Sequence, residues 1–95
     1  MNKELDKFIT IYLNEMQAAD VSGYLRPTLH GFGEEYIAAV REGLATTLST
    51  RSLSLTDYVR LTDIEFDSEE ALYSYLLDMQ EYLFGDRPRQ PAPPA

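Results

Sequence analysis

The sequence has no cysteine and no tryptophan, and its single histidine is His30. Without cysteine the chain can form neither disulfides nor zinc–thiolate sites, and it has no thiol nucleophile. No stretch approaches the roughly 18 consecutive apolar residues of a membrane span, and the charged start of the chain does not resemble a signal peptide. A chain without disulfides suits a reducing compartment, so we expect a cytoplasmic protein with no membrane partner.

Positive charge is also scarce: 8 Lys and Arg residues stand against 16 Asp and Glu residues, which gives a formal net charge of −8 at pH 7. Direct nucleic-acid binding is therefore disfavoured, because affinity for phosphate backbones comes largely from lysine and arginine. The 95 residues suffice for one domain with a modest core, and their 44% hydrophobic content is too high for a disordered chain. A core of this size is not expected to enclose a deep substrate cavity.

Apolar residues at helical spacing predict two long helices in the first half of the chain. The first covers residues 3–19, with Met16 on its buried face, and the second covers residues 33–48. Residues 24–33, which include a proline and two glycines, predict a turn or a short helical piece. Gly43 lies inside the second long helix, where glycine costs up to ~1 kcal/mol relative to alanine, so we expect it to mark a close helix crossing.

Capping signals predict two further helices in the second half of the chain. Ser54 begins a capping pair that predicts a short helix over residues 55–62. Asp67 as the N-cap and Glu70 at the third helical position form a capping box, which predicts a long helix over residues 68–84.

The remaining segments are predicted to be irregular. Residues 61–66 alternate apolar and acidic side chains, but no second strand is predicted to pair with them, so we expect an extended linker. Residues 86–95 follow Gly85 with four of the five prolines and no core residues, which indicates disorder or polyproline II structure. The sequence thus predicts an all-α fold in which residues 1–85 form a single domain, a compact bundle of three to four main helices, followed by a disordered Pro-rich tail.

Few residues are suited to catalysis or metal binding. His30 lies near Glu34 and Glu35 in the sequence, but acid–base catalysis also needs a pocket that orients a substrate, so a structural histidine is favoured over a His–Glu dyad. The acids of residues 63–70 lack the central glycine and the terminal glutamate spacing of an EF-hand loop. Residues 31–33 lack the third glycine and the preceding strand of a dinucleotide site. We expect no enzymatic activity, no cofactor and no metal.

The most informative feature is an asymmetry of charge. Residues 61–84 contain seven acidic side chains and no Lys or Arg. Acids interleaved with tyrosine and leucine are typical of a partner surface, because aromatic anchors bury area while the surrounding charge steers an oppositely charged protein. The predicted partner-binding residues are Asp63, Glu65, Asp67, Glu69, Glu70, Tyr73, Leu77, Asp78 and Glu81.

Two alternatives for this stretch remain open. A helix that is apolar over much of its circumference is often central to the core, and in that case Tyr73 and Leu77 pack inside while the acids are solvated around them. A homodimer along the same helix is opposed by like charges unless Arg41, Arg51 or Arg60 neutralises them. A monomer is favoured over a dimer.

Small size, acidity, predicted helical content and the Asp-, Glu- and Tyr-rich stretch of residues 63–75 make the chain similar to small immunity proteins of bacterial toxin systems, in particular those of contact-dependent growth inhibition. This resemblance implies a stoichiometric inhibitor of a basic protein toxin, with an RNase or DNase domain as the favoured partner. The class has no shared sequence motif, so the predicted site residues come from the charge pattern. A phage-encoded inhibitor is a variant of this hypothesis. The alternative is a non-enzymatic regulatory or adaptor domain that binds a helix or peptide, or dimerises.

Overall fold

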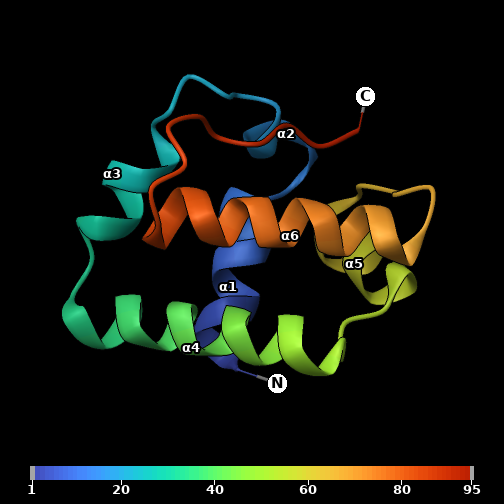
Figure 1. Ribbon diagram of the computed structural model, residues 1–95, viewed down its shortest axis with the longest axis horizontal. Helices are drawn as coiled ribbons and strands as arrows, with labels where there is room; N and C mark the ends of the chain where they lie inside the picture. Colours follow the sequence, from blue (N-terminus) through green and yellow to red (C-terminus); the bar gives the residue numbers. More distant parts are fainter. Residues whose placement is uncertain (1, 95) are drawn as a thin grey trace.

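The computed structural model describes residues 2–94 and is all-α over that range (Figure 1). The first residue of the predicted domain and the last residue of the predicted tail lie outside the described residues. No helix in this range has both the length and the hydropathy of a membrane span. The helices are α1 (Lys3–Tyr12), α2 (Glu15–Ala18), α3 (Leu25–His30), α4 (Glu34–Thr50), α5 (Leu55–Thr62) and α6 (Glu69–Phe84).

The predicted helix over residues 3–19 is wrong in one respect, because the chain breaks at Asn14 into α1 and α2. The side-chain oxygen of Asn14 accepts hydrogen bonds from the N–H groups of Met16 and Gln17, at 3.1 and 2.9 Å. Asparagine is a strong N-cap, and its side chain competes with the backbone pairing of a continuous helix. As a result Met16, predicted to be buried, is 84% exposed.

The other helix predictions hold more closely. The short piece expected in residues 24–33 is α3, and the helix predicted over residues 55–62 has the bounds of α5. The hydroxyl of Ser54 accepts from the backbone N–H of Asp57 at 3.0 Å, which confirms the predicted cap. The second long helix extends to Thr50, two residues beyond the prediction.

The predicted N-cap of α6 is corrected by one residue. Ser68, not Asp67, is the N-cap, and its hydroxyl accepts from the N–H of Ala71 at 3.1 Å. Ala71 therefore occupies the third helical position, and the predicted Asp67–Glu70 capping box does not form. Serine and aspartate have nearly equal N-cap preferences, so neighbouring positions could not be separated from the sequence.

Helix α6 lies at the centre of the fold, with α4 beside it and α3 packed near its end (Figure 1). Helix α1 crosses α4 at Gly43, where an added Cβ would lie only 2.8 Å from the side-chain nitrogen of Asn2. The predicted close crossing is therefore confirmed. Seven side chains of α6 are buried, which are Leu72, Tyr73, Tyr75, Leu76, Met79, Tyr82 and Leu83.

Basic side chains of α3 bind carbonyl groups in the last turn of α6. The Nε of Arg26 donates to the carbonyl of Tyr82 at 2.6 Å, and its guanidinium lies 4.3 Å from the centre of the Tyr82 ring. Nε2 of His30 lies 2.8 Å from the carbonyl of Leu83. These carbonyls have no partner within the helix, so the two side chains of α3 satisfy them. The positive guanidinium of Arg26 also complements the helix dipole at this end.

Four tyrosines are buried in the core, and their hydroxyls differ in hydrogen bonding. The Tyr82 hydroxyl donates to the carbonyl of Gly23 at 2.9 Å. The Tyr73 hydroxyl donates to the carbonyl of Leu53 at 2.8 Å and accepts from the N–H of the same residue at 3.0 Å. The hydroxyls of Tyr58 and Tyr75 have no hydrogen-bond partner among the described residues. Burial raises the pKa of Tyr58 and of Tyr75 well above the ordinary value for tyrosine.

The Pro-rich tail has no helix or strand in residues 86–94, but its predicted disorder is not confirmed. Gln90 is buried, and its side-chain nitrogen donates to the carbonyl of Asp20 at 3.0 Å. Pro91 is also buried, and Arg26 donates to the carbonyl of Arg87. The prediction that the tail takes no part in the core is therefore corrected. Proline prevents regular structure, but it does not prevent packing.

The unequal hydrogen bonding of the tyrosines leads to a stability prediction. Tyr73→Phe should lower the free energy of unfolding by about 1–3 kcal/mol, because it leaves the buried backbone groups of Leu53 unpaired. Tyr75→Phe is the matched control, and it should be neutral or stabilising because its hydroxyl makes no hydrogen bond within the described chain. Urea unfolding of both variants measures the difference. Equal losses of unfolding free energy in the two variants would contradict the different hydrogen-bonding roles of the two hydroxyls.

Stability should also fall at alkaline pH. Tyr75 keeps its proton in the folded state because burial raises its pKa, whereas the unfolded chain loses that proton near pH ~10. The contribution of Tyr75 to the free energy of unfolding is therefore fully present below pH ~10 and is lost as the pH rises above it. Urea unfolding at pH ~8 and ~11 measures how far the free energy of unfolding falls between the two pH values. This fall should be smaller for Tyr75→Phe than for the wild type. Parallel losses would show that Tyr75 does not contribute.

Candidate functional site

The connection between α5 and α6 turns three acidic side chains outward. Ile64 and Phe66 are buried, whereas Asp63, Glu65 and Asp67 are exposed, so the predicted alternation is observed. The linker predicted over residues 61–66 is corrected at its start, because its first two residues belong to α5. Successive side chains of an extended chain point to opposite sides, which explains why burying the apolar pair exposes the acids between and beside it. We call Asp63, Glu65 and Asp67 the acidic loop. None of its carboxylates has an ion pair with a described residue.

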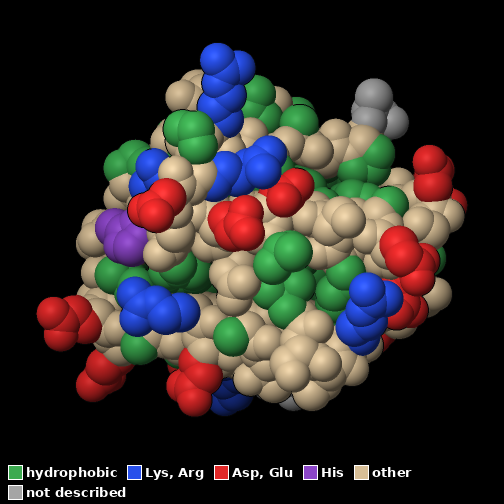
Figure 2. All heavy atoms as spheres, in the orientation of Figure 1, with side chains coloured by type: hydrophobic (Ala, Val, Ile, Leu, Met, Phe, Trp, Pro, Cys, Tyr) green, Lys and Arg blue, Asp and Glu red, His purple; other side chains and the backbone are tan. Residues whose placement is uncertain are grey.

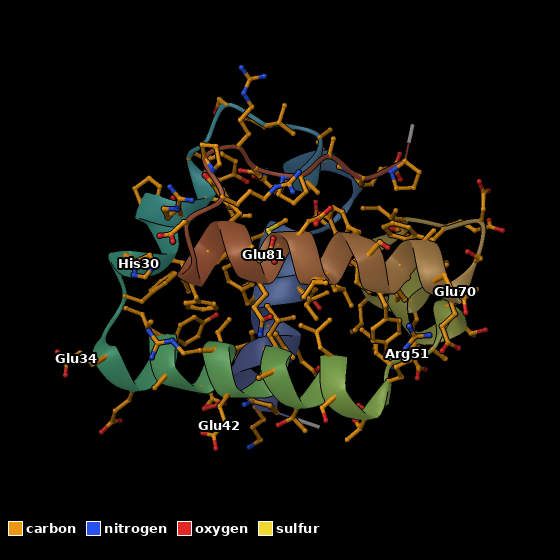
Figure 3. All side chains as sticks on the ribbon, in the orientation of Figure 1. His30, Glu34, Glu42, Arg51, Glu70 and Glu81 are labelled. Atoms are coloured by element: carbon orange, nitrogen blue, oxygen red, sulfur yellow. The ribbon has the colours of Figure 1, made fainter. Side chains whose placement is uncertain are left out.

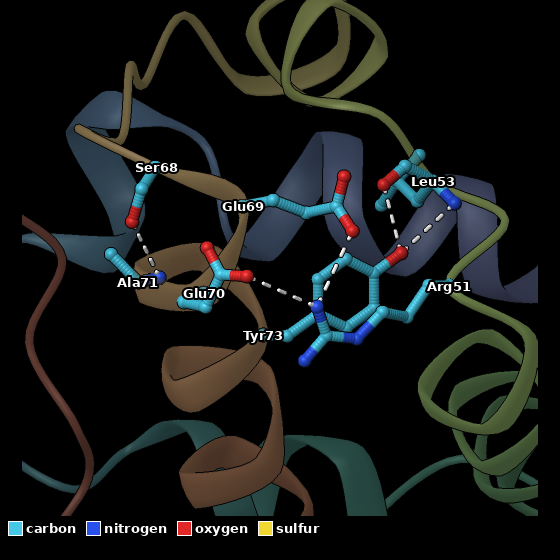
Figure 4. Close-up of polar contacts among 7 residues, drawn as sticks. All are labelled: Arg51, Leu53, Ser68, Glu69, Glu70, Ala71 and Tyr73. Carbon is cyan, nitrogen blue, oxygen red and sulfur yellow. Dashed lines mark hydrogen bonds and ion pairs between the residues drawn. The ribbon is translucent and has the colours of Figure 1, made fainter.

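Arg51 neutralises the next two predicted site residues, Glu69 and Glu70 (Figure 4). Its Nη1 lies 3.4 Å from Oε1 of Glu69 and 3.7 Å from Oε1 of Glu70. Its guanidinium also lies 5.0 Å from the centre of the Tyr73 ring. Arg51 ends α4 in the left-handed conformation, with φ of 50°, and this turn brings it to the start of α6. Glu69 and Glu70 are therefore exposed but already paired.

The last two predicted acids lie farther along α6. Asp78 forms an ion pair with Arg87 of the tail at 3.4 Å, and Glu81 is exposed on the face shown in Figure 3. Figure 2 shows the acidic side chains of this face in separate groups, with basic side chains between them. The acids that the sequence predicted as one partner surface thus lie in two places, in the acidic loop and at separate positions along α6.

The two predicted apolar anchors have different environments. Tyr73 is only 4% exposed, so the alternative of core packing holds for this residue. Leu77 is 47% exposed and lies in a shallow groove between α4 and α6. Tyr73 also lines this groove. The groove is lined by Leu48, Arg51, Glu70, Tyr73, Ser74 and Leu77.

A second apolar hollow adjoins the acidic loop and was missed by sequence reasoning. Leu55, Val59 and Phe66 line it, together with Thr56, and Glu65 lies at its edge. Leu55 and Val59 are four residues apart on α5, so helical spacing could have placed them on one face. We call this the α5 hollow. It places apolar surface directly beside unpaired carboxylates of the described chain.

The residues considered for catalysis do not come together. His30 binds the carbonyl of Leu83, and its ring lies edge-on to Phe84 with centres 6.0 Å apart. Figure 3 shows the side chain of Glu34 directed away from His30. Histidine here has the structural role that the sequence favoured. Among residues 2–94 no group of three His, Asp or Glu side chains has the arrangement of metal ligands.

Comparison with protein-family models, with curated proteins and with solved structures gave no significant match. The chemistry of the candidate site therefore rests on its geometry. Exposed carboxylates beside an apolar hollow can bind a cationic surface that also presents an apolar side chain.

The pairing of Arg51 gives a prediction about stability. Arg51→Met should lower the free energy of unfolding by less than about 1 kcal/mol at low salt, because both ion pairs are solvent-exposed. Arg60→Met is a matched control that removes the exposed pair with Asp57. Urea unfolding at low and high salt measures both effects, and the loss should shrink at high salt. A salt-independent loss above about 2 kcal/mol would contradict this description of Arg51.

Proposed function

We propose that the protein is a stoichiometric inhibitor that binds a basic protein through the acidic loop and the adjoining α5 hollow. The observation that carries the proposal is that Glu65 lines the same hollow as the apolar side chains of Leu55 and Val59, with Asp63 and Asp67 exposed in the same loop. The favoured partner is a protein toxin with an RNase or DNase domain, in keeping with the resemblance to immunity proteins. The protein itself has no catalytic role in this proposal.

Electrostatic complementarity supports a nuclease as the partner. An enzyme that acts on nucleic acid presents lysine and arginine to the phosphate backbone, so its substrate surface is basic. Exposed carboxylates on a folded scaffold can occupy the same surface and exclude the substrate. The net charge of −8 extends this attraction beyond the contact itself and should accelerate association at low salt.

The α5 hollow supplies the apolar part of the proposed interface. Hot spots of protein interfaces are buried side chains that fill pockets, and charged groups at the rim contribute more to association rate and specificity. A leucine, methionine or aromatic side chain of the partner would enter between Leu55, Val59 and Phe66. The other four acids of the predicted site contribute to the general negative field only, and they are Glu69, Glu70, Asp78 and Glu81.

A second candidate function rests on Leu77. Its exposure in the groove between α4 and α6 favours a regulatory or adaptor domain that accepts an amphipathic helix. In that case apolar burial supplies most of the binding free energy, and the neighbouring acids contribute little to it. Salt dependence separates the two functions, because screening weakens charge-steered association but barely affects an apolar groove.

The decisive test replaces the acidic loop by isosteres. The variant Asp63→Asn, Glu65→Gln, Asp67→Asn should lower the association rate with a basic nuclease toxin encoded beside this protein by about tenfold at low salt. Its helix content should be unchanged, because the three side chains are exposed and none of them caps a helix through its side chain. Biolayer interferometry at low and high salt measures the rate, and growth during co-expression of the toxin measures protection.

The matched control removes the same number of charges elsewhere. Glu34, Glu35 and Glu42 are exposed on α4, and their replacement by glutamine should change the association rate by less than about threefold. Equal effects of the two triple variants would assign the attraction to net charge alone and reject the acidic loop as the binding surface. Loss of protection by Leu77→Ala, with the acidic-loop variant still active, would assign inhibition to the groove around Leu77 and reject the acidic loop as the binding surface.

A further inference from the structure

The tail lies against a groove on the body of the protein. Residues 87–94 pass along α6 (Figure 1), and a hollow of about 340 Å³ remains between them and the body. Its floor is apolar and aromatic, and its edges carry two acids of the predicted site. We call the body side of this hollow the tail groove, which consists of Phe66, Asp67, Ala71, Tyr75 and Asp78.

The tail makes four polar contacts with the body among the described residues. They are the ion pair of Arg87 with Asp78, the hydrogen bonds from Arg26 to the carbonyl of Arg87 and from the N–H of Arg87 to the carbonyl of Glu81, and the hydrogen bond from Gln90 to Asp20. The ion pair between Arg87 and Asp78 is partly exposed to solvent, so its contribution to docking is small. Within the described chain the Gln90 side chain makes one hydrogen bond, which it donates to the carbonyl of Asp20. Its own side-chain oxygen is buried without a hydrogen-bond partner among the described residues, as is the hydroxyl of Tyr75. Asp20, Arg26 and Glu81 lie outside the tail groove, so within the groove the tail is held by the Arg87–Asp78 pair and by apolar packing, and another segment can compete for it.

The chemistry of the tail identifies what the groove accepts. Residues 87–94 contain two arginines and four prolines. Proline limits the conformations available to a free segment, so an extended proline-rich segment loses little entropy on binding to an aromatic surface. Arginine complements the acids at the edge of the groove, as Arg87 already does at Asp78.

We propose that the tail groove is a docking site for an extended, proline-rich, arginine-bearing segment of a partner protein, and that the chain's own tail is an internal competitor for it. This inference rests on the proposed function in one respect, because it takes the basic partner as the source of that segment. Docking of the tail lowers the apparent affinity of the groove for the partner segment, because only the molecules in which the groove is uncovered can bind it. Release of the tail would also free Asp78 and thus enlarge the acidic surface beside Asp67.

The test uses a fluorescent peptide with the sequence of residues 86–94 and the full-length protein. The variant Arg87→Ala, Gln90→Ala removes both polar contacts of the tail side chains with the body. Fluorescence anisotropy should show that this variant binds the peptide about tenfold more tightly than the wild type does. Adding Asp78→Asn to the double variant should abolish its gain in peptide affinity. A peptide with glutamate at the position of Arg87 should not bind.

A second measurement covers the case in which the double variant is poorly folded. Titration of the ¹⁵N-labelled wild type with a large excess of peptide should shift the amide signals of Ala71 and Tyr75 and leave those of Glu34 and Glu42 unchanged. Glu34 and Glu42 lie on α4, away from the tail groove (Figure 3). Absence of shifts at Ala71 and Tyr75, or equal peptide affinity of the wild type and the double variant, would overturn the proposal.

Light scattering on a sizing column separates a partner segment from a second copy of this chain. A monomer is expected at all concentrations. A dimer that disappears in the Arg87→Ala, Gln90→Ala variant would assign the groove to tail exchange between copies and overturn the proposal. The peptide measurements need no toxin, so peptide binding without toxin neutralisation would reject the proposed inhibitor alone. Toxin neutralisation without peptide binding would reject the tail groove alone.

Discussion

Burial of α6 is the constraint on which the rest of the structure depends. Seven of its side chains are buried, and they face more than one direction, so a single neighbouring helix cannot cover them. Helix α4 lies along one side, α3 packs near the end, and the linker before α6 adds Ile64 and Phe66 to the same core. Among the polar groups that this packing buries, the Tyr73 hydroxyl is satisfied by two hydrogen bonds with the backbone of Leu53.

The same burial decides where the charges lie. When Ile64 and Phe66 turn inward, the acids that alternate with them turn outward. Elsewhere the fold brings arginines to the acids: Arg51 comes from the end of α4 to the start of α6, and Arg87 returns from the tail to Asp78. The carboxylates of the acidic loop, in contrast, form no ion pair with a described residue. Apolar side chains of α5 lie directly beside this loop.

The acidic loop and the tail groove meet at residues 66 and 67, where Phe66 borders both hollows and Asp67 belongs to the loop and to the edge of the groove. A basic partner that binds the loop is thus positioned next to the segment that the tail occupies. In this arrangement a surface side chain can enter the α5 hollow while an extended segment displaces the tail. The two proposals describe neighbouring parts of one interface, with the tail controlling how much of it is open.

Local patterns in the sequence determined the all-α class, the bounds of α5, the close crossing at Gly43 and the alternating linker. Helical periodicity and capping depend on residues three or four apart, so they can be read along the chain. Tertiary structure alone decided that Tyr73 is buried, that Arg51 pairs with Glu69 and that Gln90 binds Asp20. The partners in those two contacts are 18 and 70 residues apart. Their distance in space follows from how the helices cover α6, and no local pattern encodes it.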